Sequence, residues 1–349
     1  MKIVNCMFGA GLGGLEQVFV DYSEALSARG HEVLHLVAPR AMVIPRLEGL
    51  GFPYIETPNF NQYDVFAMWR IRRRLRSLSP DVVIAHGNRA INLVKPAAKS
   101  IAPLIAVNHS IKVGRTVGAD FAIAINEDMR RRLIEAGQPE ARVFKVFNMI
   151  RPPARTAPVK PLSSPPVIGA MGRFVPKKGF EKFIEALALL KNQGVPFTAT
   201  LAGDGVLAPA LKALASSQGL DDALRFPGWI TDKAEFFRDI DVFCFTSNHD
   251  VCPLVLLEAF LYAKPVVLSD SPGPREISAD GVDSLLFPID DAAALAERIR
   301  QLIENPSFAQ GLAMAAQRKI LDHHTIDKGG ERLDSIIRRV VEQGSARRR

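Results

Sequence analysis

Short apolar runs alternate with longer segments of helical periodicity along the chain. In the first half, the apolar runs are residues 2–7, 33–37, 82–85, 104–107 and 121–125. Continuous apolar runs are typical of parallel strands that are buried on both faces, and the helical segments between them supply the crossovers. This rhythm predicts a doubly wound α/β sheet.

The second half repeats the rhythm after a proline-rich segment. Six prolines between residues 152 and 166 exclude a continuous helix or a central strand there, because proline lacks an amide donor. The strands expected beyond it are residues 167–171, 197–202, 223–226, 242–245 and 266–268, with helices near 179–193, 207–218 and 253–262. From residue 292 the pattern is helical to about 343, with breaks near 305–306 and 323–325.

This pattern predicts two Rossmann-like domains of α/β class that face each other across a cleft. The first spans residues 1–150 and the second 167–323, joined by a linker at 151–166. Residues 324–349 are expected to pack back on the first domain as C-terminal helix and basic tail. A length of 349 residues agrees with two separate cores.

Composition narrows the function classes. Forty-four basic and 37 acidic residues give a formal net charge of +7, and the positive excess is concentrated in the segment Arg70, Arg72, Arg73, Arg74, Arg76 and at Arg347, Arg348, Arg349. Such surfaces attract nucleic acids, anionic bilayers or phosphorylated small molecules.

The three cysteines lack CxxC spacing, so we expect neither a disulfide framework nor a metal site. Without a membrane-spanning apolar stretch, a cytoplasmic location is the default expectation.

A glycine-rich loop follows the first expected strand. Residues 9–16 read Gly-Ala-Gly-Leu-Gly-Gly-Leu-Glu and lead into a helix, so backbone amides at the helix start can approach a phosphate or a sugar. A dinucleotide site is an alternative, but the glycine register is poor and no acidic residue ends the second strand near Val37. A tight turn that packs helix on strand is the other alternative.

Two further loops carry charge beside a helix start. Residues 172–179 follow a buried strand and place Arg173 and Lys178 between glycines, which suits a diphosphate, although they can also be ordinary surface charges. Residues 248–259 place Asp250 before a helix and Glu258 in its second turn. Asp250 can be a helix cap, whereas Glu258 lies among apolar neighbours, where an unpaired carboxylate is costly.

These motifs, in this order, resemble the family 4 glycosyltransferases over almost the whole chain. The resemblance rests on Gly13-Gly14-Leu15-Glu16, Gly172-Arg173, Lys178-Gly179, Ala202-Gly203-Asp204-Gly205, Pro227-Gly228, and Asp250 with Glu258. It implies the GT-B fold and metal-independent, retaining transfer of a sugar from a nucleotide-diphosphate sugar, with no cofactor. The family's paired acids are both glutamate, so Asp250 departs from the pattern by one methylene.

The resemblance also implies roles for single residues. Arg173 and Lys178 match the cations on the donor diphosphate, Glu258 the acid on the ribose, and Asp250 the acid on the donor sugar. His109 resembles the histidine beside that sugar. The positions that match donor-contacting backbone or helix-start residues are Gly13, Gly14, Gly203, Gly205, Pro253, Leu254 and Val255. Glu16, Glu127 and Asn148 match polar positions that face the cleft.

The acceptor implied by the resemblance is a glycan or a lipid-linked, lipopolysaccharide-type molecule. The arginine segment 70–76 can rest on an anionic membrane at its inner face, or it can be a solvated helix face. Two other functions remain open: a sugar-nucleotide epimerase of the GT-B fold, and a non-enzymatic protein that binds anionic ligands. We expect no nucleic-acid partner, because no recognition motif accompanies the charge.

Overall fold

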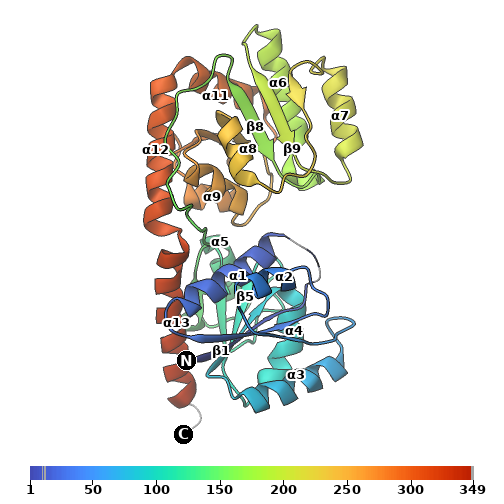
Figure 1. Cartoon of the computed structure of the whole chain (residues 1–349), viewed down its shortest axis with the longest axis vertical. Coiled ribbons are helices and arrows are strands. Elements are labelled where there is room, and N and C mark those ends of the chain that lie inside the picture. The colour runs from blue at the N-terminus through green and yellow to red at the C-terminus, as the bar shows by residue number, and fades with distance from the viewer. Residues whose placement is uncertain (10, 12, 347–349) are drawn as a thin grey trace. The chain divides into compact units, whose positions relative to one another are not determined.

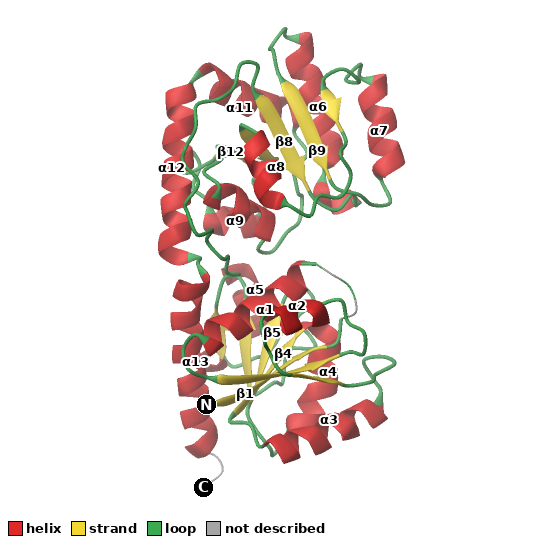
Figure 2. Cartoon of the chain, in the orientation of Figure 1, coloured by secondary structure: helices red, strands yellow, loops and turns green. Residues whose placement is uncertain are grey.

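The computed structural model describes residues 1–9, 11 and 13–346. Within this part of the chain, residues 1–151 and 324–349 form one compact unit, and residues 152–323 form the other. We call them unit 1 and unit 2. In both units, helices flank the sheet on its two faces (Figure 2).

Unit 1 is built on a parallel sheet with the strand order β3-β2-β1-β4-β5-β6-β7. Its strands are β1 (Lys2–Met7), β2 (Glu32–Val37), β3 (Tyr54–Glu56), β4 (Val82–His86), β5 (Leu104–Asn108), β6 (Phe121–Ala124) and β7 (Val143–Lys145). Its helices are α1 (Gly14–Ser27), α2 (Ile44–Gly49), α3 (Val65–Leu78), α4 (Gly87–Ala98), α5 (Glu127–Glu135) and α13 (Ile326–Ala346), with a 3-10 turn at Glu140–Arg142. Strand order reverses between β1 and β4, and open α/β sheets bind ligands at the carboxyl ends of the strands at such a point.

Unit 2 repeats the design with a second parallel sheet in the order β10-β9-β8-β11-β12-β13. Its strands are β8 (Val167–Met171), β9 (Thr198–Ala202), β10 (Leu224–Arg225), β11 (Val242–Phe245), β12 (Val266–Ser269) and β13 (Leu285–Phe287). Its helices are α6 (Phe180–Asn192), α7 (Ala208–Ser217), α8 (Lys233–Asp239), α9 (Leu254–Leu261), α10 (Pro272–Ile277), α11 (Ala292–Glu304) and α12 (Pro306–His323), with a 3-10 turn at Pro176–Lys178. Here the order reverses between β8 and β11.

Each sheet is held by its own apolar core. The inner strands of both sheets are buried almost throughout, because helices cover both faces. In unit 1, α1 packs against α13 on one face, and α3 packs against α4 on the other (Figure 1). In unit 2, α6 packs against both α7 and α11, and α9 packs against α12. Burial of this apolar surface is the dominant stabilising contribution in each unit.

The last helix belongs to unit 1, as the expected packing of the C-terminal segment on the first domain requires. His31 Nε2 lies 2.7 Å from Asp334 Oδ1, and Arg29 Nη2 donates to Asp327 Oδ1 at 3.0 Å. A parallel β-bridge between Ile150 and Thr325 also connects the C-terminal segment with the rest of unit 1. Arg347, Arg348 and Arg349, part of the expected basic tail, lie outside the described residues.

Three short strands were not expected from the apolar pattern. β3, β7 and β13 have three residues each, and they are less deeply buried than the central strands. Each pairs with one neighbour at the edge of a sheet, and with three residues each is too short to stand out as an apolar run. Among the described residues, no helix combines the length and the apolar character needed to cross a membrane.

Candidate functional site

In unit 2, the loop after β8 is tied to the loop after β11, across the point where strand order reverses. Thr246 Oγ1 donates to the carbonyl of Lys178 at 2.8 Å, and Ser247 Oγ donates to the carbonyl of Lys177 at 2.9 Å. Gly179 lies between the two loops with a φ of 60°. A Cβ there would stand 2.5 Å from the carbonyl oxygen of Thr246, so this junction requires glycine.

This junction brings Lys178 and Asp250 into direct contact. Lys178 Nζ lies 2.5 Å from Asp250 Oδ2, and both side chains are largely buried. Lys177 Nζ reaches Asp250 Oδ1 at 3.3 Å from a more exposed position. Burial alone would raise the pKa of Asp250, but the two ammonium groups, Lys178 foremost, hold that pKa below its ordinary value. Asp250 therefore stays ionised and fixes the direction of Lys178.

Arg173 lies on the same loop and points to solvent. Its side chain forms no hydrogen bond or ion pair with any residue that the structure describes, so its guanidinium is available to a ligand. The loop that carries it is braced by Gly203 and Gly205, which follow β9. A Cβ on Gly203 would stand 1.8 Å from the carbonyl oxygen of Gly172, and one on Gly205 would stand 2.5 Å from that of Phe174. These glycines hold the cationic loop in place through backbone contact.

Glu258 occupies the second turn of α9, and its two oxygens have different surroundings. Lys233, the first residue of α8, donates to Oε1 at 2.6 Å. Oε2 is buried and has no hydrogen-bond partner among the described residues. A buried carboxylate oxygen without a donor is costly. A ligand hydroxyl that donates to Oε2 would remove that cost.

The start of α9 offers backbone donors beside these side chains. Pro253 is buried and caps the helix, and Leu254 and Val255 form its first turn. Within the described part of the chain, the amides of Leu254 and Val255 donate to no acceptor. Free amides and the helix dipole make such a terminus favourable for phosphate.

In unit 1, the predicted residues lie around the carboxyl ends of β1, β4 and β5. His109 follows β5, and its Nε2 lies 3.2 Å from Nδ1 of His86, the last residue of β4. Gly13 caps α1 and Gly14 begins it, and both are exposed. The carboxylate of Glu16 folds back over the loop, within 3.0 Å of where a Cβ would stand on Gly9. Ala10 and Leu12 of this loop lie outside the described residues.

Two predicted polar residues of unit 1 lie in other surroundings. Glu127 begins α5 and forms surface ion pairs with Arg130 at 3.0 Å and with Lys145 at 3.1 Å. Burial would raise the pKa of Glu127, but these two partners hold it below its ordinary value. Asn148 is buried in the segment after β7. Neither contacts His109 or Gly13 in any described interaction.

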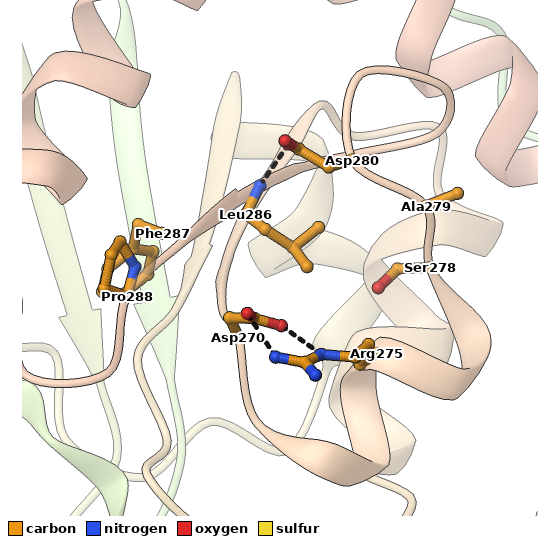
Figure 3. A pocket seen from close by; sticks show the side chains of 8 residues that line it. All are labelled: Asp270, Arg275, Ser278, Ala279, Asp280, Leu286, Phe287 and Pro288. Carbon is orange, nitrogen blue, oxygen red and sulfur yellow. Dashed lines mark hydrogen bonds and ion pairs between the residues drawn. The ribbon is translucent and has the colours of Figure 1, made fainter.

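A separate hollow of about 430 Å³ lies at the carboxyl ends of β12 and β13 (Figure 3). Its prominent polar group is Arg275, whose guanidinium forms two hydrogen bonds to the carboxylate of Asp270. The wall is formed by Asp270, Arg275, Ser278, Ala279, Asp280, Leu286, Phe287 and Pro288. None of the predicted site residues lines this hollow.

Several residues that contact the predicted ones were not singled out by the sequence pattern. Lys177, Lys233 and His86 contact Asp250, Glu258 and His109, respectively. Lys177 is adjacent to Lys178, and His86 ends a buried strand, so the nearby sequence could have indicated both residues as candidates for the site. Lys233 lies 25 residues before Glu258, and nothing near it in the chain indicates the contact.

Both halves of the chain match known protein families. Residues 12–152 match the model of Glycosyltransferase Family 4, and residues 156–319 match that of Glycosyl transferases group 1. The chain is 29% identical over 317 residues to the lipopolysaccharide core biosynthesis glycosyltransferase LpsD of Rhizobium meliloti, covering 90% of this chain and 91% of that protein. It is 30% identical over 321 residues to LpsE of the same organism, covering 90% and 92%.

A solved structure gives the same result for the fold. HepE of Anabaena, determined in complex with UDP, superimposes with a TM-score of 0.82 at 20% identity, over 96% of this chain and 99% of that one. At this level of identity the likeness concerns the fold alone. It shows the GT-B fold that the sequence motifs implied.

Proposed function

This chain belongs to the glycosyltransferases of the family 4 type, and from that premise we propose that it moves a sugar from a nucleotide-diphosphate sugar onto a glycan or a lipid-linked, lipopolysaccharide-type acceptor, with retention of configuration and without a metal ion. The observation that carries the donor assignment is the unpaired buried oxygen of Glu258 on α9, the helix that follows the loop of Asp250. A ribose hydroxyl would supply the hydrogen-bond donor that this oxygen lacks.

Charge supports a diphosphate at the same edge of the sheet. Arg173, Lys177 and Lys178 carry positive charge there, and Asp250 offsets a part of it. The remaining positive charge suits a diphosphate, with Arg173 as a planar fork and Lys178 as a point charge. The free amides at the start of α9 add donors. These groups take the place that a divalent cation has in metal-dependent transferases.

The chemical step breaks the bond between the anomeric carbon and the diphosphate oxygen. Negative charge grows on the diphosphate and positive charge on the sugar, so groups that already point at the diphosphate stabilise the transition state most. Arg173 and Lys178 supply this stabilisation. The acceptor oxygen attacks from the face that the diphosphate leaves, passes its proton to the diphosphate oxygen, and so retains the configuration.

The remaining predicted residues act on the sugar. Asp250, kept ionised by its lysine partners, accepts hydrogen bonds from sugar hydroxyls, and His109 forms a hydrogen bond with the sugar. Gly13 and Gly14 leave room for the sugar and diphosphate beside the first turn of α1. This assignment requires Asp250 to serve the role that glutamate has in the family, with a shorter side chain.

Donor binding is expected to raise the melting temperature of the protein, because a ligand that binds the folded state stabilises it. UDP-, GDP- and ADP-sugars are compared in a thermal-shift screen. Glu258→Gln keeps the shape of the side chain but weakens its acceptor, and it should abolish most of the shift with the active donor. Glu297→Gln, an exposed glutamate of α11, serves as the matched control and should keep the shift. No shift with any nucleotide sugar would contradict the proposal.

The reaction itself is followed by NMR with the donor found in that screen. We expect product only when an acceptor is present, with the anomeric configuration of the donor, and at an unchanged rate in excess EDTA. Conversion of the donor without acceptor would instead identify an epimerase. Loss of turnover in EDTA, or inversion at the anomeric carbon, would contradict the metal-independent retaining mechanism.

We also propose that unit 1 contacts an anionic membrane through α3 and the loop before it, which together we call the α3 surface. Its large apolar side chains are exposed, from 60% for Trp69 to 90% for Phe60; they are Phe60, Tyr63, Val65, Phe66 and Trp69. Arg73, Arg74 and Arg76 are exposed beside them. Exposed aromatic side chains next to arginines favour the interface of an anionic bilayer.

The arginines of this segment divide into two groups. Arg72 donates to the carbonyls of Ala97 and Lys99, and Arg70 donates to that of Pro58, so both are held within unit 1. Arg73, Arg74 and Arg76 therefore supply the charge of the α3 surface. The sequence led us to expect that all five arginines of the segment 70–76 contact the membrane, and the proposal now includes only these three.

Vesicle sedimentation tests this membrane contact. We expect binding to vesicles that contain anionic lipid and weaker binding to neutral ones. Replacing Arg73 and Arg74 with glutamine should weaken anionic binding by about 30-fold, from roughly 1 kcal/mol for each arginine. Phe66→Ser with Trp69→Ser should weaken binding to both kinds. Met314→Ser, an exposed apolar residue of α12, is the control. Equal binding to neutral and anionic vesicles would contradict the proposal.

A further inference from the structure

Two histidines on neighbouring strands of unit 1 form a hydrogen-bonded pair. His86 ends β4 and His109 follows β5, so the parallel pairing of these strands brings their side chains together. His86 Nδ1 lies 3.2 Å from His109 Nε2, and the rings are nearly parallel, with an interplanar angle of 24°. The pair lies next to the reversal of strand order between β1 and β4, where open α/β sheets bind ligands.

The surroundings keep both imidazoles neutral. His86 is fully buried and meets the rings of Phe19 and Tyr22 at nearly right angles, with centroids 5.6 and 4.9 Å away. Burial lowers the pKa of His109 to about 4 and that of His86 well below its ordinary value, with the proximity of His109 and His35 adding to the shift of His86. A neutral imidazole carries one proton, so the hydrogen bond between the rings has a single direction.

The outer nitrogen of His86 decides that direction. Its Nε2 is buried and has no hydrogen-bond partner among the described residues. If Nε2 carried the proton, a buried N–H would be left without an acceptor, which is rare in proteins. With the proton on Nδ1, His86 donates to Nε2 of His109, and only the lone pair on Nε2 of His86 remains without a partner. His109 must then carry its own proton on Nδ1.

We propose that His86 is a positioning residue that fixes the tautomer and the ring orientation of His109, so that His109 presents Nδ1–H as a hydrogen-bond donor to an oxygen of the donor sugar. Nδ1 of His109 has no partner among the described residues, and the residue keeps a part of its surface accessible to solvent. The contact with sugar rests on the proposed function, whereas the tautomer does not. A hydroxyl oxygen of the sugar accepts this proton, and His109 keeps the other ring nitrogen for His86.

His35 provides a comparison within the same core. Its Nδ1 faces the carbonyl of Pro53 at 2.9 Å, and its Nε2 faces Ser23 Oγ at 2.7 Å. Because a carbonyl can only accept, His35 carries its proton on Nδ1, and both ring nitrogens have partners inside the unit. His35 therefore has a structural role. His86 differs because its single hydrogen bond is made to His109.

Nitrogen NMR tests the tautomer without any substrate. In protein labelled with ¹⁵N in its seven histidines, long-range proton–nitrogen correlations distinguish protonated from bare ring nitrogens. His109 is assigned by the loss of its signals in His109→Ala. We expect a protonated Nδ1 and a bare Nε2 in the wild type. His86→Phe should abolish this preference, whereas His86→Asn, whose amide can donate from a similar position, should preserve it. A protonated Nε2 in the wild type, or an unchanged tautomer in His86→Phe, would overturn the proposal.

A double-mutant cycle then tests the link to turnover. His86→Phe is expected to lower kcat/KM by about tenfold, the scale seen when the hydrogen-bond partner of a functional histidine is removed. His86→Asn should restore most of this loss. In a His109→Ala background, His86→Phe should change kcat/KM by no more than about twofold, because its effect passes through His109. Additive effects would show that His86 acts only on the fold.

The two experiments separate the two hypotheses. If the expected tautomer is found but His109→Ala has normal turnover, the proposed contact of His109 with sugar fails while the pairing stands. His35→Phe is the control for packing, and it should lower the melting temperature without changing the tautomer of His109. Melting temperatures are measured for each variant, and His86→Asn provides a second readout if His86→Phe folds poorly.

Discussion

Lys178→Ala is expected to lower kcat by about two to three orders of magnitude with donor and acceptor saturating, as when one preorganised donor to a developing anion is removed. Lys178 is largely buried, contacts Asp250 and lies over the ring of Phe245, so its ammonium group is held in one place. A fixed charge that needs no rearrangement during the reaction stabilises the transition state more than a mobile one. The measurement is steady-state transfer with the donor identified by thermal shift.

Lys177→Ala is the matched control for that variant. Lys177 reaches the same carboxylate at 3.3 Å, but its side chain is about half exposed, and exposed pairs contribute little. We expect a change in kcat of less than about fivefold, corresponding to at most about 1 kcal/mol. Near-normal turnover of Lys178→Ala, with an unchanged melting temperature, would rule out its assignment to the diphosphate. Equal losses of kcat in both variants would indicate that the two substitutions act through Asp250 and not through the diphosphate.

Gly203→Ala is expected to cause the largest loss of stability. Gly203 has a φ of 138°, and a Cβ there would stand 1.8 Å from the carbonyl oxygen of Gly172. Strain in this region, together with overpacking, should cost about 3 kcal/mol or more. For a unit of this size the melting temperature should fall by roughly 6–12 °C. Donor binding should weaken as well, because the displaced backbone carries Arg173.

Gly194→Ala is the control for backbone strain alone. Its φ is 75°, but a Cβ at this position would have no neighbour within 4 Å. The left-handed conformation should cost about 1 kcal/mol without any clash. Thermal unfolding followed by circular dichroism compares the two variants. If both lose the same stability, contact between the loops after β8 and β9 does not constrain Gly203.

Much of the fold was predictable from local sequence because buried parallel strands are continuous apolar runs. The central strands of both sheets were expected within one or two residues of where they lie. β3, β7 and β13 were missed, because each is an edge strand of only three residues, which is too short to stand out as an apolar run. The break before α13 was visible in the chain, but the packing of α13 on the rest of unit 1 depends on contacts such as His31 with Asp334, which lie 303 residues apart.

The candidate site divides in the same way. Glycines and charges at strand ends indicated the loops of Arg173, Lys178 and Asp250, because parallel strands place their carboxyl ends at one edge. The lysine partner of Glu258 was not predictable. Lys233 meets Glu258 from another helix, and the buried Oε2 of Glu258 is defined by packing around α9.

By itself, the sequence determined which segments form the central strands and which loops carry glycine and charge. These properties depend on neighbours within a few positions along the chain. Only the tertiary structure decided that Asp250 is bound by Lys178, that one oxygen of Glu258 lacks a partner, and that Nδ1 of His86 lies within hydrogen-bond distance of Nε2 of His109. Burial and pairing depend on residues distant in sequence, and the same side chain in a solvated loop would have neither.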